Sequence, residues 1–338
     1  MVQESGGAQV NILINTCRKT TKSSLQAIQG KAEEIAMRHG KYSGVLVALT
    51  LFLVMSCRLA LAGPALSGLV GWYQASSLSL SNGAAVGSWN DLSGNGNTLT
   101  AYGSGITYVT NALNGQSAVS FNGGGYFNAA LMNGLNGTSF EMFAVVTGYT
   151  SGTVADVGQT GNLSSAAPGI YYNEAILGYQ FDAAGNGTSI YHETSPGNFN
   201  SLYHQNSPGT SPYLLDGVYG TSATSLTSYV NGVASTDAIN AVGQGGGGSA
   251  QPYTAVSRQL EVGDRGNESV ALNGQIAALL VYNTTLTAMQ EQQTGYYLQS
   301  MYGISGTYTS VPEPATPALV LGGVALVGLL RKRVARAV

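Results

Sequence analysis

The feature that most constrains the fold is the scarcity of charge in the long middle of the chain. From Gly63 to Ser310 the sequence contains no Lys and only two basic residues, Arg258 and Arg265. The same stretch contains twelve acidic residues, which gives it a formal charge of −10. Surface helices carry a charged face, whereas this chain is rich in Gly, with 47, and in Tyr, with 20. We therefore predict many short strands joined by tight turns.

The same distribution of charge excludes some functions. A surface that binds nucleic acid neutralises phosphates with Lys and Arg, so we expect no nucleic-acid partner. Both cysteines, Cys17 and Cys57, precede Gly63. The middle of the chain therefore forms no disulfide, and its stability must come from a sizeable hydrophobic core.

A signal peptide is predicted over residues 37–62. It has a positively charged start, an apolar run over 45–55 and an A-x-A pattern of small residues before the cut. The residues of the predicted cleavage site are Ala60, Ala62 and Gly63, with the cut between the last two. This pattern implies export by the Sec machinery.

The residues before this signal, 1–36, are polar and mixed in charge. We interpret them as a non-native extension, with translation starting at Met37; an unusually long n-region is the alternative. The segment Val54–Cys57 weakly resembles a lipobox, but Arg58 follows the cysteine directly, which disfavours lipidation.

Apolar residues alternate with other residues in several segments of the middle region. Val70 and Trp72, and the alternate residues of 140–146, have the pattern of strands with one buried face. Residues 276–281 are continuously apolar, as expected for a strand covered on both sides. Asn231-Gly232 is the preferred pair for a type I′ hairpin turn. Two antiparallel sheets that face each other would bury these residues, which predicts a β-sandwich.

One helix is predicted at the C-terminal end of this region. Thr287 can cap it, Gln290 completes a capping box, and Gly303 follows as the C′ residue. Residues that recur at every fourth position along it are Met289, Gln293, Tyr297 and Met301.

Five segments of the middle region occur in a fixed order. They are Gly68–Ala75 with Val86–Leu99, then Ala118–Gly123, Phe140–Val146, Tyr229–Gly232 and Leu272–Asn283. This order resembles the concanavalin A-like, laminin-G-like (LamG) jelly-roll domains of bacterial surface proteins, over Leu69 to Ile304. The resemblance implies an all-β antiparallel sandwich over 63–308 with one short C-terminal helix. Gln290 and Met301 depart from the helix pattern of that family, where Glu and a basic residue are usual.

The C-terminal segment 309–338 has three parts. They are Pro312-Glu313-Pro314, an apolar stretch over 315–330, and a basic tail over 331–338 that begins with Arg331, Lys332 and Arg333. This segment resembles the PEP-CTERM sorting signal of Gram-negative bacterial surface proteins, which an exosortase processes. The resemblance implies a transmembrane helix over 315–330, an intermediate anchored in the inner membrane, and release to the cell surface or the extracellular matrix.

An ordinary membrane anchor is the alternative for this segment. The uninterrupted apolar run from Ala318 to Leu330 would span about 20 Å as a helix, less than the roughly 30 Å hydrocarbon core of a bilayer. A cleaved sorting signal does not need a durable anchor, and the basic tail would keep this end cytoplasmic.

No pattern of catalytic residues is evident in the sequence. The densest acidic cluster consists of Glu261, Asp264 and Glu268, and the intervening Gly263 and Gly266 predict a solvated turn. A glycosidase needs two facing carboxylates, which this arrangement does not provide. We therefore predict no catalytic residues and no enzyme activity.

A calcium site is considered at Asp91 and Asn95. The segment Asp91-x-Ser93-x-Asn95-x-Asn97 places oxygen-bearing side chains at alternate positions, as in a calcium loop. The favoured alternative is a tight turn in which Asp91 and Ser93 accept hydrogen bonds from nearby N–H groups. Asp156 and Asp264 are weaker candidates.

Glycan binding is suggested by the many tyrosines between Thr150 and Thr224, because sugars stack on exposed aromatic rings. Tyr also fills half-buried strand positions, so a structural role is the alternative. Trp72 and Trp89 are expected in the core.

Taken together, these patterns predict a non-enzymatic, exported surface or matrix protein. Its function would be adhesion, glycan binding or matrix structure, with an extracellular polysaccharide as partner. The alternatives are a glycan-active hydrolase of the concanavalin A-like superfamily and a purely structural protein with no specific ligand.

Overall fold

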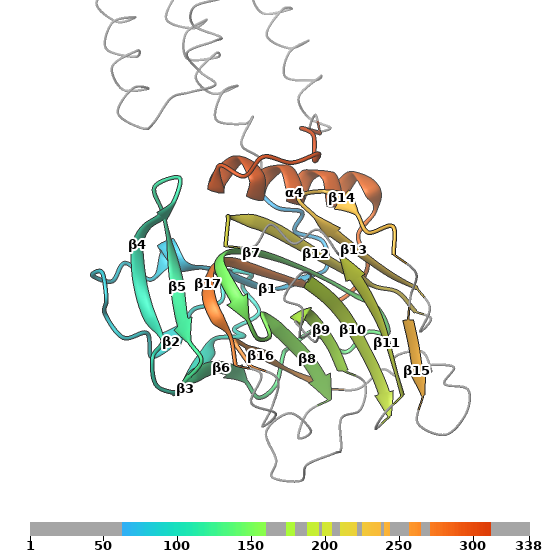
Figure 1. Ribbon diagram of the computed structural model, residues 1–338, viewed down its shortest axis with the longest axis horizontal. Helices are drawn as coiled ribbons and strands as arrows, with labels where there is room; N and C mark the ends of the chain where they lie inside the picture. Colours follow the sequence, from blue (N-terminus) through green and yellow to red (C-terminus); the bar gives the residue numbers. More distant parts are fainter. Residues whose placement is uncertain are drawn as a thin grey trace, which may run out of the picture. The chain divides into compact units, whose positions relative to one another are not determined.

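The computed structural model describes residues 63–159, 174–179, 188–195, 198–204, 210–221, 225–237, 240–243, 257–264 and 271–311. They belong to one compact unit, Gly63–Val311 (Figure 1). The predicted extension 1–36, signal peptide 37–62, sorting tripeptide 312–314, transmembrane segment 315–330 and basic tail 331–338 lie outside the described residues. No helix within the described ranges combines the length and the apolar character needed to cross a membrane.

The described strands form two antiparallel sheets. In the first sheet, β17 (Asn273–Tyr282) is central and pairs with β7, with β5, and with β1 beyond the end of β5. The spatial order is β14 (Val233–Ala234), β13 (Leu226–Val230), β12 (Tyr213–Tyr219), β7 (Phe140–Ser151), β17, β5 (Gln116–Asn122) and β4 (Thr107–Leu113), with β1 (Leu69–Gln74) beside β17. A short 3-10 turn, η2 (Ala75–Ser77), follows β1.

The second sheet is also antiparallel throughout. Its spatial order is β15 (Asn240–Gly243), β11 (Asn198–His204), β10 (Thr188–Ser195), β9 (Glu174–Tyr179), β8 (Ala155–Gln159), β16 (Arg258–Val262), β6 (Gly125–Ala129), β3 (Leu99–Gly103) and β2 (Ser88–Trp89). Because β16 and β17 are neighbours in sequence but lie in different sheets, the chain crosses the sandwich between them.

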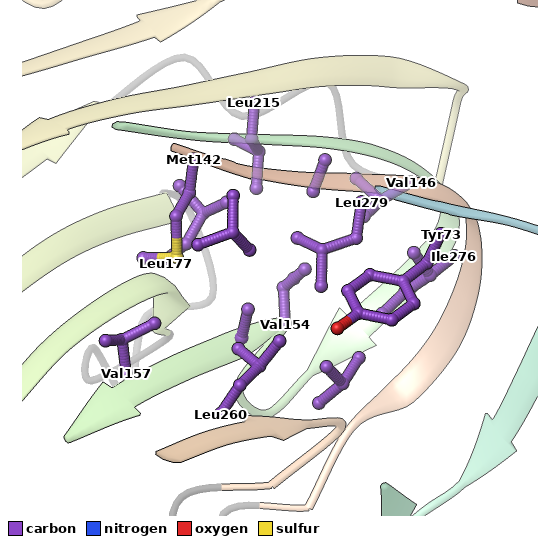
Figure 2. Close-up of a cluster of buried hydrophobic side chains, with 14 of the residues drawn as sticks. Tyr73, Met142, Val146, Val154, Val157, Leu177, Leu215, Leu260, Ile276 and Leu279 are labelled. Carbon is purple, nitrogen blue, oxygen red and sulfur yellow. The ribbon is translucent and has the colours of Figure 1, made fainter. Parts of the chain in front are cut away.

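The main hydrophobic core lies between the two sheets. Met142, Val146 and Leu279 of the first sheet face Leu177 and Leu260 of the second (Figure 2). All five side chains are buried, and each contributes about 1.5–3 kcal/mol through removal of its apolar surface from water. The predicted β-sandwich is therefore confirmed. The prediction that 140–146 has only one buried face is wrong, because Glu141, Phe143 and Val145 on the opposite face are buried as well.

The predicted type I′ turn joins β13 to β14. Asn231 and Gly232 have φ angles of 54° and 80°, the positive values that this turn requires. A Cβ atom on Gly232 would lie 2.5 Å from the Thr307 hydroxyl oxygen, so the glycine also allows a later segment to approach.

The single helix of the described residues, α4 (Ala288–Tyr302), has the predicted ends. Thr287 and Gln290 form the capping box, and Gly303 ends the helix with a φ of 67°. The residues at every fourth position from Met289 do not all lie on the buried face, because Met289 is 60% exposed. Successive positions four apart drift around a helix of 3.6 residues per turn. The buried face consists instead of Thr294, Gly295, Tyr297, Leu298, Gln299 and Tyr302.

Helix α4 covers the outer face of the first sheet (Figure 1). A second apolar cluster fills this contact, which we call the covered face; its sheet residues include Phe143, Val145, Leu214, Leu280 and Tyr282. The helix contributes Tyr297, Leu298 and Tyr302 to the cluster. Strand β17 is thus buried on both sides, as its continuous apolar run predicts.

Candidate functional site

The outer face of the second sheet is polar, in contrast to its inner face. Strand alternation produces this difference: Phe127 and Ala129 point into the core, so Asn128 between them points outward. The residues of this polar face are Ser88, Thr100, Tyr102, Tyr126, Asn128, Asp156 and Glu261.

Two carboxylates and an amide form a row across three neighbouring strands of the polar face. Glu261 of β16 lies opposite Asn128 of β6 on one side and opposite Asp156 of β8 on the other. Directly opposed residues have Cβ atoms about 4.5–5.5 Å apart. Asn128 Nδ2 donates a hydrogen bond of 3.0 Å to Glu261 Oε1, and both carboxylates are 0% exposed.

Two stacked tyrosines lie beside this row, nearer the edge of the sheet. Tyr102 of β3 lies opposite Tyr126 of β6, with ring centroids 5.4 Å apart and an interplanar angle of 14°. Tyr102 is 49% exposed, whereas Tyr126 is half-buried. Burial raises the pKa of Tyr126, and the negative charge of Glu261 raises it further, so the two side chains are in electrostatic contact.

The remaining members of the polar face add hydroxyl groups to this edge. Ser88 of β2 lies opposite Thr100 of β3, and both residues are exposed. Thr100 in turn lies opposite Asn128. The face therefore combines a stacked aromatic pair with exposed hydroxyls and a buried row of hydrogen-bonding groups.

The prediction of a solvated turn at Glu261 is wrong. Glu261 lies in strand β16 and is fully buried, between the core residues Leu260 and Val262. Gly263, with a φ of +93°, bends the chain only after the strand has ended, and Asp264 is half-buried there. Glu268 lies outside the described residues. The alternation of β16 is visible in the sequence, but the opposition of Glu261 to Asp156 depends on pairing between distant segments.

The Asp91 side chain is surrounded by donors. Its Oδ1 accepts hydrogen bonds from the N–H groups of Trp72 (3.0 Å) and Ser93 (2.8 Å), and its Oδ2 accepts from Ser93 Oγ (2.8 Å) and the Asn97 N–H (3.0 Å). Asn95 Nδ2 donates to the Leu69 carbonyl at 3.1 Å. These contacts are those of a tight turn that ties the loop to β1. Calcium binding by Asp91 and Asn95 stays a prediction.

Two tyrosines of the 150–224 region have side chains that the structure describes, and neither is available to a sugar. Tyr213 and Tyr219 are 0% exposed and belong to the core between the sheets. Trp89 is likewise in the core, as predicted, whereas Trp72 is half-buried and packs edge-on against Tyr297 of α4. The stacked pair of Tyr102 and Tyr126 lies earlier in the chain, outside the region in which the sequence suggests glycan binding.

A second polar cluster lies on the covered face and was not predicted. Glu141, Asp216 and Glu291 come from β7, β12 and α4, and each offers an oxygen within 4.8 Å of the others. The three residues are far apart in the sequence, so no local motif marks them.

The C-terminal segment matches a known family model. Residues 310–334 match the PEP-CTERM protein-sorting motif, which confirms the predicted sorting signal around Pro312, Glu313 and Pro314. The match extends past the predicted flanking residues Arg331, Lys332 and Arg333. No curated protein matches the chain in sequence.

Solved structures of several kinds are distantly similar to the chain. Domain 4 of AbnA, a GH43 extracellular arabinanase from Geobacillus stearothermophilus, has 17% identity and a TM-score of 0.43, over 68% of this chain and 97% of that chain. An arabinofuranosidase complexed with arabinofuranosyl-α-1,2-xylobiose has 18% identity and a TM-score of 0.47, over 75% and 63%. The binding domain of botulinum neurotoxin DC, in complex with rat synaptotagmin II, has 9% identity and a TM-score of 0.44, over 70% and 52%. The chain thus spans between half and two thirds of the last two structures.

Proposed function

We propose that this protein is an exported, non-enzymatic surface or extracellular-matrix protein whose polar face binds glycan chains. The sorting motif at 310–334 supports export, with processing by an exosortase and release to the cell surface or matrix. The order of the strand motifs supports a laminin-G-like jelly roll as the domain that is displayed.

The observation that carries this proposal is the stacked pair of Tyr102 and Tyr126 at the edge of the polar face. A sugar ring has flat C–H surfaces that pack on aromatic rings, and its hydroxyls require nearby hydrogen-bonding groups. The exposed hydroxyls of Ser88 and Thr100 provide such groups. Asn128 and Glu261 lie beside the rings on the same face of the sheet, where their side chains hydrogen-bond to each other.

A polysaccharide array identifies the ligand. We expect the wild-type protein to bind at least one polysaccharide and Tyr102→Ala to weaken that binding about two- to tenfold, since stacking of this kind contributes about 0.5–1.5 kcal/mol. Tyr296→Ala, on α4 at the other side of the sandwich, is a matched aromatic control that retains binding. A wild-type protein that binds no polysaccharide would favour the purely structural alternative.

A glycan-active hydrolase is the second candidate, and the opposition of Asp156 to Glu261 favours it. Retaining glycosidases place two carboxyl groups about 5–5.5 Å apart, close to the spacing of directly opposed residues. Both carboxylates are 0% exposed, however, so a substrate would have to open this face to reach them. For this reason glycan binding ranks first. Release of reducing sugar that Glu261→Gln and Asp156→Asn both abolish would establish the hydrolase instead.

A further inference from the structure

Three carboxyl groups meet beneath the N-terminal half of α4. Glu141 and Asp216 project from the covered face of the first sheet, and Glu291 projects from the first turn of the helix. Glu141 and Asp216 are 0% exposed, and Glu291 is half-buried. The cluster is therefore closed by the sheet on one side and reaches solvent on the side of Glu291.

Strand register brings the two buried carboxyls together. Glu141 shares its face of β7 with Phe143 and Val145, and Asp216 lies opposite Phe143. Glu141 and Asp216 are thus diagonal neighbours on a face that is otherwise apolar. Carboxylates at such positions are unfavourable unless a positive charge or hydrogen-bond donors compensate for their loss of hydration.

Hydrogen-bond donors reach only one of the two carboxyl oxygens of Glu141 and of Asp216. Glu141 Oε2 accepts from the Leu286 N–H and Asp216 Oδ2 accepts from the Tyr308 hydroxyl, both at 2.7 Å. The other oxygens, Glu141 Oε1 and Asp216 Oδ1, are buried without a hydrogen-bond partner among the residues that the structure describes. Among the described residues Arg258 is the only Lys or Arg, and its guanidinium lies over the Phe140 ring, in the core between the sheets.

The electrostatic setting agrees with this geometry. Burial raises the pKa of Glu141 to about 8, and the nearby Glu291 contributes to the rise. Burial and the charge of Glu141 raise the pKa of Asp216 well above its usual range. Tyr229, which lies opposite Asp216 on β13, has a pKa raised to about 12 by burial and by the same three carboxylates. The raised pKa values reflect acidic groups that lie close together and that no basic side chain among the described residues neutralises.

We propose that Glu141, Asp216 and Glu291 bind one Ca²⁺ ion between the first sheet and α4. The ligands are all oxygens, which Ca²⁺ prefers. Oxygens on opposite sides of a Ca²⁺ ion are about 4.6–5.2 Å apart, so the 4.8 Å limit of the cluster allows all three carboxylates to reach one ion. The partner-free oxygens of Glu141 and Asp216 would then have a ligand, and water would complete the coordination on the half-buried side of Glu291.

This site would strengthen one particular part of the molecule. It joins β7, β12 and α4, and through Tyr308 it includes the segment that leads into the sorting motif at 310. Extracellular calcium modules bind with Kd values of about 10⁻⁴–10⁻³ M, and we expect an affinity in this range. The ion would stabilise the docking of α4 after export, and the site differs from the calcium loop predicted at Asp91.

The test uses the full-length protein in mild detergent, with CaCl₂ titrated against a sample in EDTA. We expect CaCl₂ to raise the Tm by several degrees and Tb³⁺ to give tyrosine-sensitised luminescence that Ca²⁺ displaces. Asp216→Asn should weaken Ca²⁺ binding at least tenfold. Calcium binding that is kept in Asp216→Asn and lost in Asp91→Asn would overturn the proposal and assign the ion to the Asp91 loop instead.

Glu291→Gln keeps the test decisive if Asp216→Asn does not fold, because Glu291 is half-exposed and its amide retains the shape of the side chain. We expect this variant to fold normally and to bind Ca²⁺ at least threefold more weakly. The proposal is overturned if CaCl₂ up to 10 mM leaves the Tm unchanged, or if the calcium response persists at full strength in Glu291→Gln.

Discussion

The two outer faces of the sandwich differ although the inner faces of both sheets are equally apolar. On the first sheet, α4 packs over Phe143, Leu214 and Leu280 and closes the face to solvent. On the second sheet, the outward residues Asn128, Glu261 and Asp156 are buried as well, and exposure is limited to the edge that carries Ser88, Thr100 and Tyr102. Because side chains alternate along a strand, every sheet has an inner and an outer face. An outer face that a helix covers adds to stability, whereas an exposed edge of an outer face remains available to a ligand.

Both outer faces contain buried carboxylates, but the hydrogen-bond donors around these carboxylates differ. Glu261 on the polar face accepts a hydrogen bond from Asn128, whereas Glu141 on the covered face retains an oxygen with no donor. A carboxylate that is already hydrogen-bonded can help to shape a surface for a neutral ligand. A carboxylate without a donor is suited to a cation.

The largest loss of stability is expected when packing is removed from the covered face. Leu298→Ala should lower the free energy of unfolding by about 2–5 kcal/mol, because Leu298 is 0% exposed between α4 and the first sheet. Tyr102→Ala should change it by less than about 0.5 kcal/mol, as expected for an exposed site. Urea unfolding of both variants measures this difference. Equal losses would show that the two faces contribute alike.

Removing divalent cations should make the covered face sensitive to pH. The pKa of Glu141 is raised in the folded protein to about 8 from the ordinary value of 4.5, so this group stabilises the fold fully below the ordinary value. That contribution is lost as pH rises towards about 8. The groups around it are Asp216 on β12, Tyr229 on β13, Glu291 on α4 and Tyr308.

We therefore expect the Tm in EDTA to fall by several degrees between pH 5 and pH 8, and to fall less in Asp216→Asn, which lacks one of the coupled carboxyls. Thermal unfolding at a series of pH values measures both slopes. A variant whose Tm falls as steeply as that of the wild type would argue against this assignment.

A single added methyl group tests how tightly α4 is docked. A Cβ atom on Gly295 would lie 2.3 Å from Cδ2 of Tyr308. Helix propensity alone would favour Ala over Gly by about 1 kcal/mol. We expect Gly295→Ala to destabilise the protein by about 1–3 kcal/mol, because the clash outweighs the propensity. Met289→Ala, at an exposed position of the same helix, is the control with little effect. A stabilised Gly295→Ala would mean that Tyr308 moves aside easily.

The smallest effect is expected at the start of α4. Thr287→Ala removes the side chain that caps the helix at Gln290 N, at a cost of about 1 kcal/mol. Thr287→Ser keeps the hydroxyl and should retain most of the stability. Both values come from the same urea titrations, and an Ala variant as stable as the wild type would show that packing alone holds the helix.

Features encoded by neighbouring residues could be predicted from the sequence. The Asn231-Gly232 turn and the Thr287–Gln290 capping box depend on residues a few positions apart, and both are present. The continuous apolar run of β17 reflects burial on both sides, and it was also predicted correctly. The alternation of β7 predicts one buried face, but helix α4, which is distant in the sequence, buries the other face too.

The candidate sites depend on pairing between distant segments, which the sequence does not display. The glycines that follow Glu261 predict a turn, and only the pairing of β16 with β8 places Glu261 in a strand, opposite Asp156. The meeting of Glu141 with Asp216 requires the register of β7 with β12. In each case strand pairing, rather than any motif, brings the groups together.

The central claim is that the edge of the polar face binds glycan, and calorimetric titration tests it most directly. The ligand is the polysaccharide that binds best on the array, titrated into wild type, the Tyr102→Ala/Tyr126→Ala double variant, and Tyr296→Ala. We predict that the double variant stays folded and loses at least tenfold in affinity, while Tyr296→Ala binds like the wild type. Wild-type affinity in the double variant would contradict the claim.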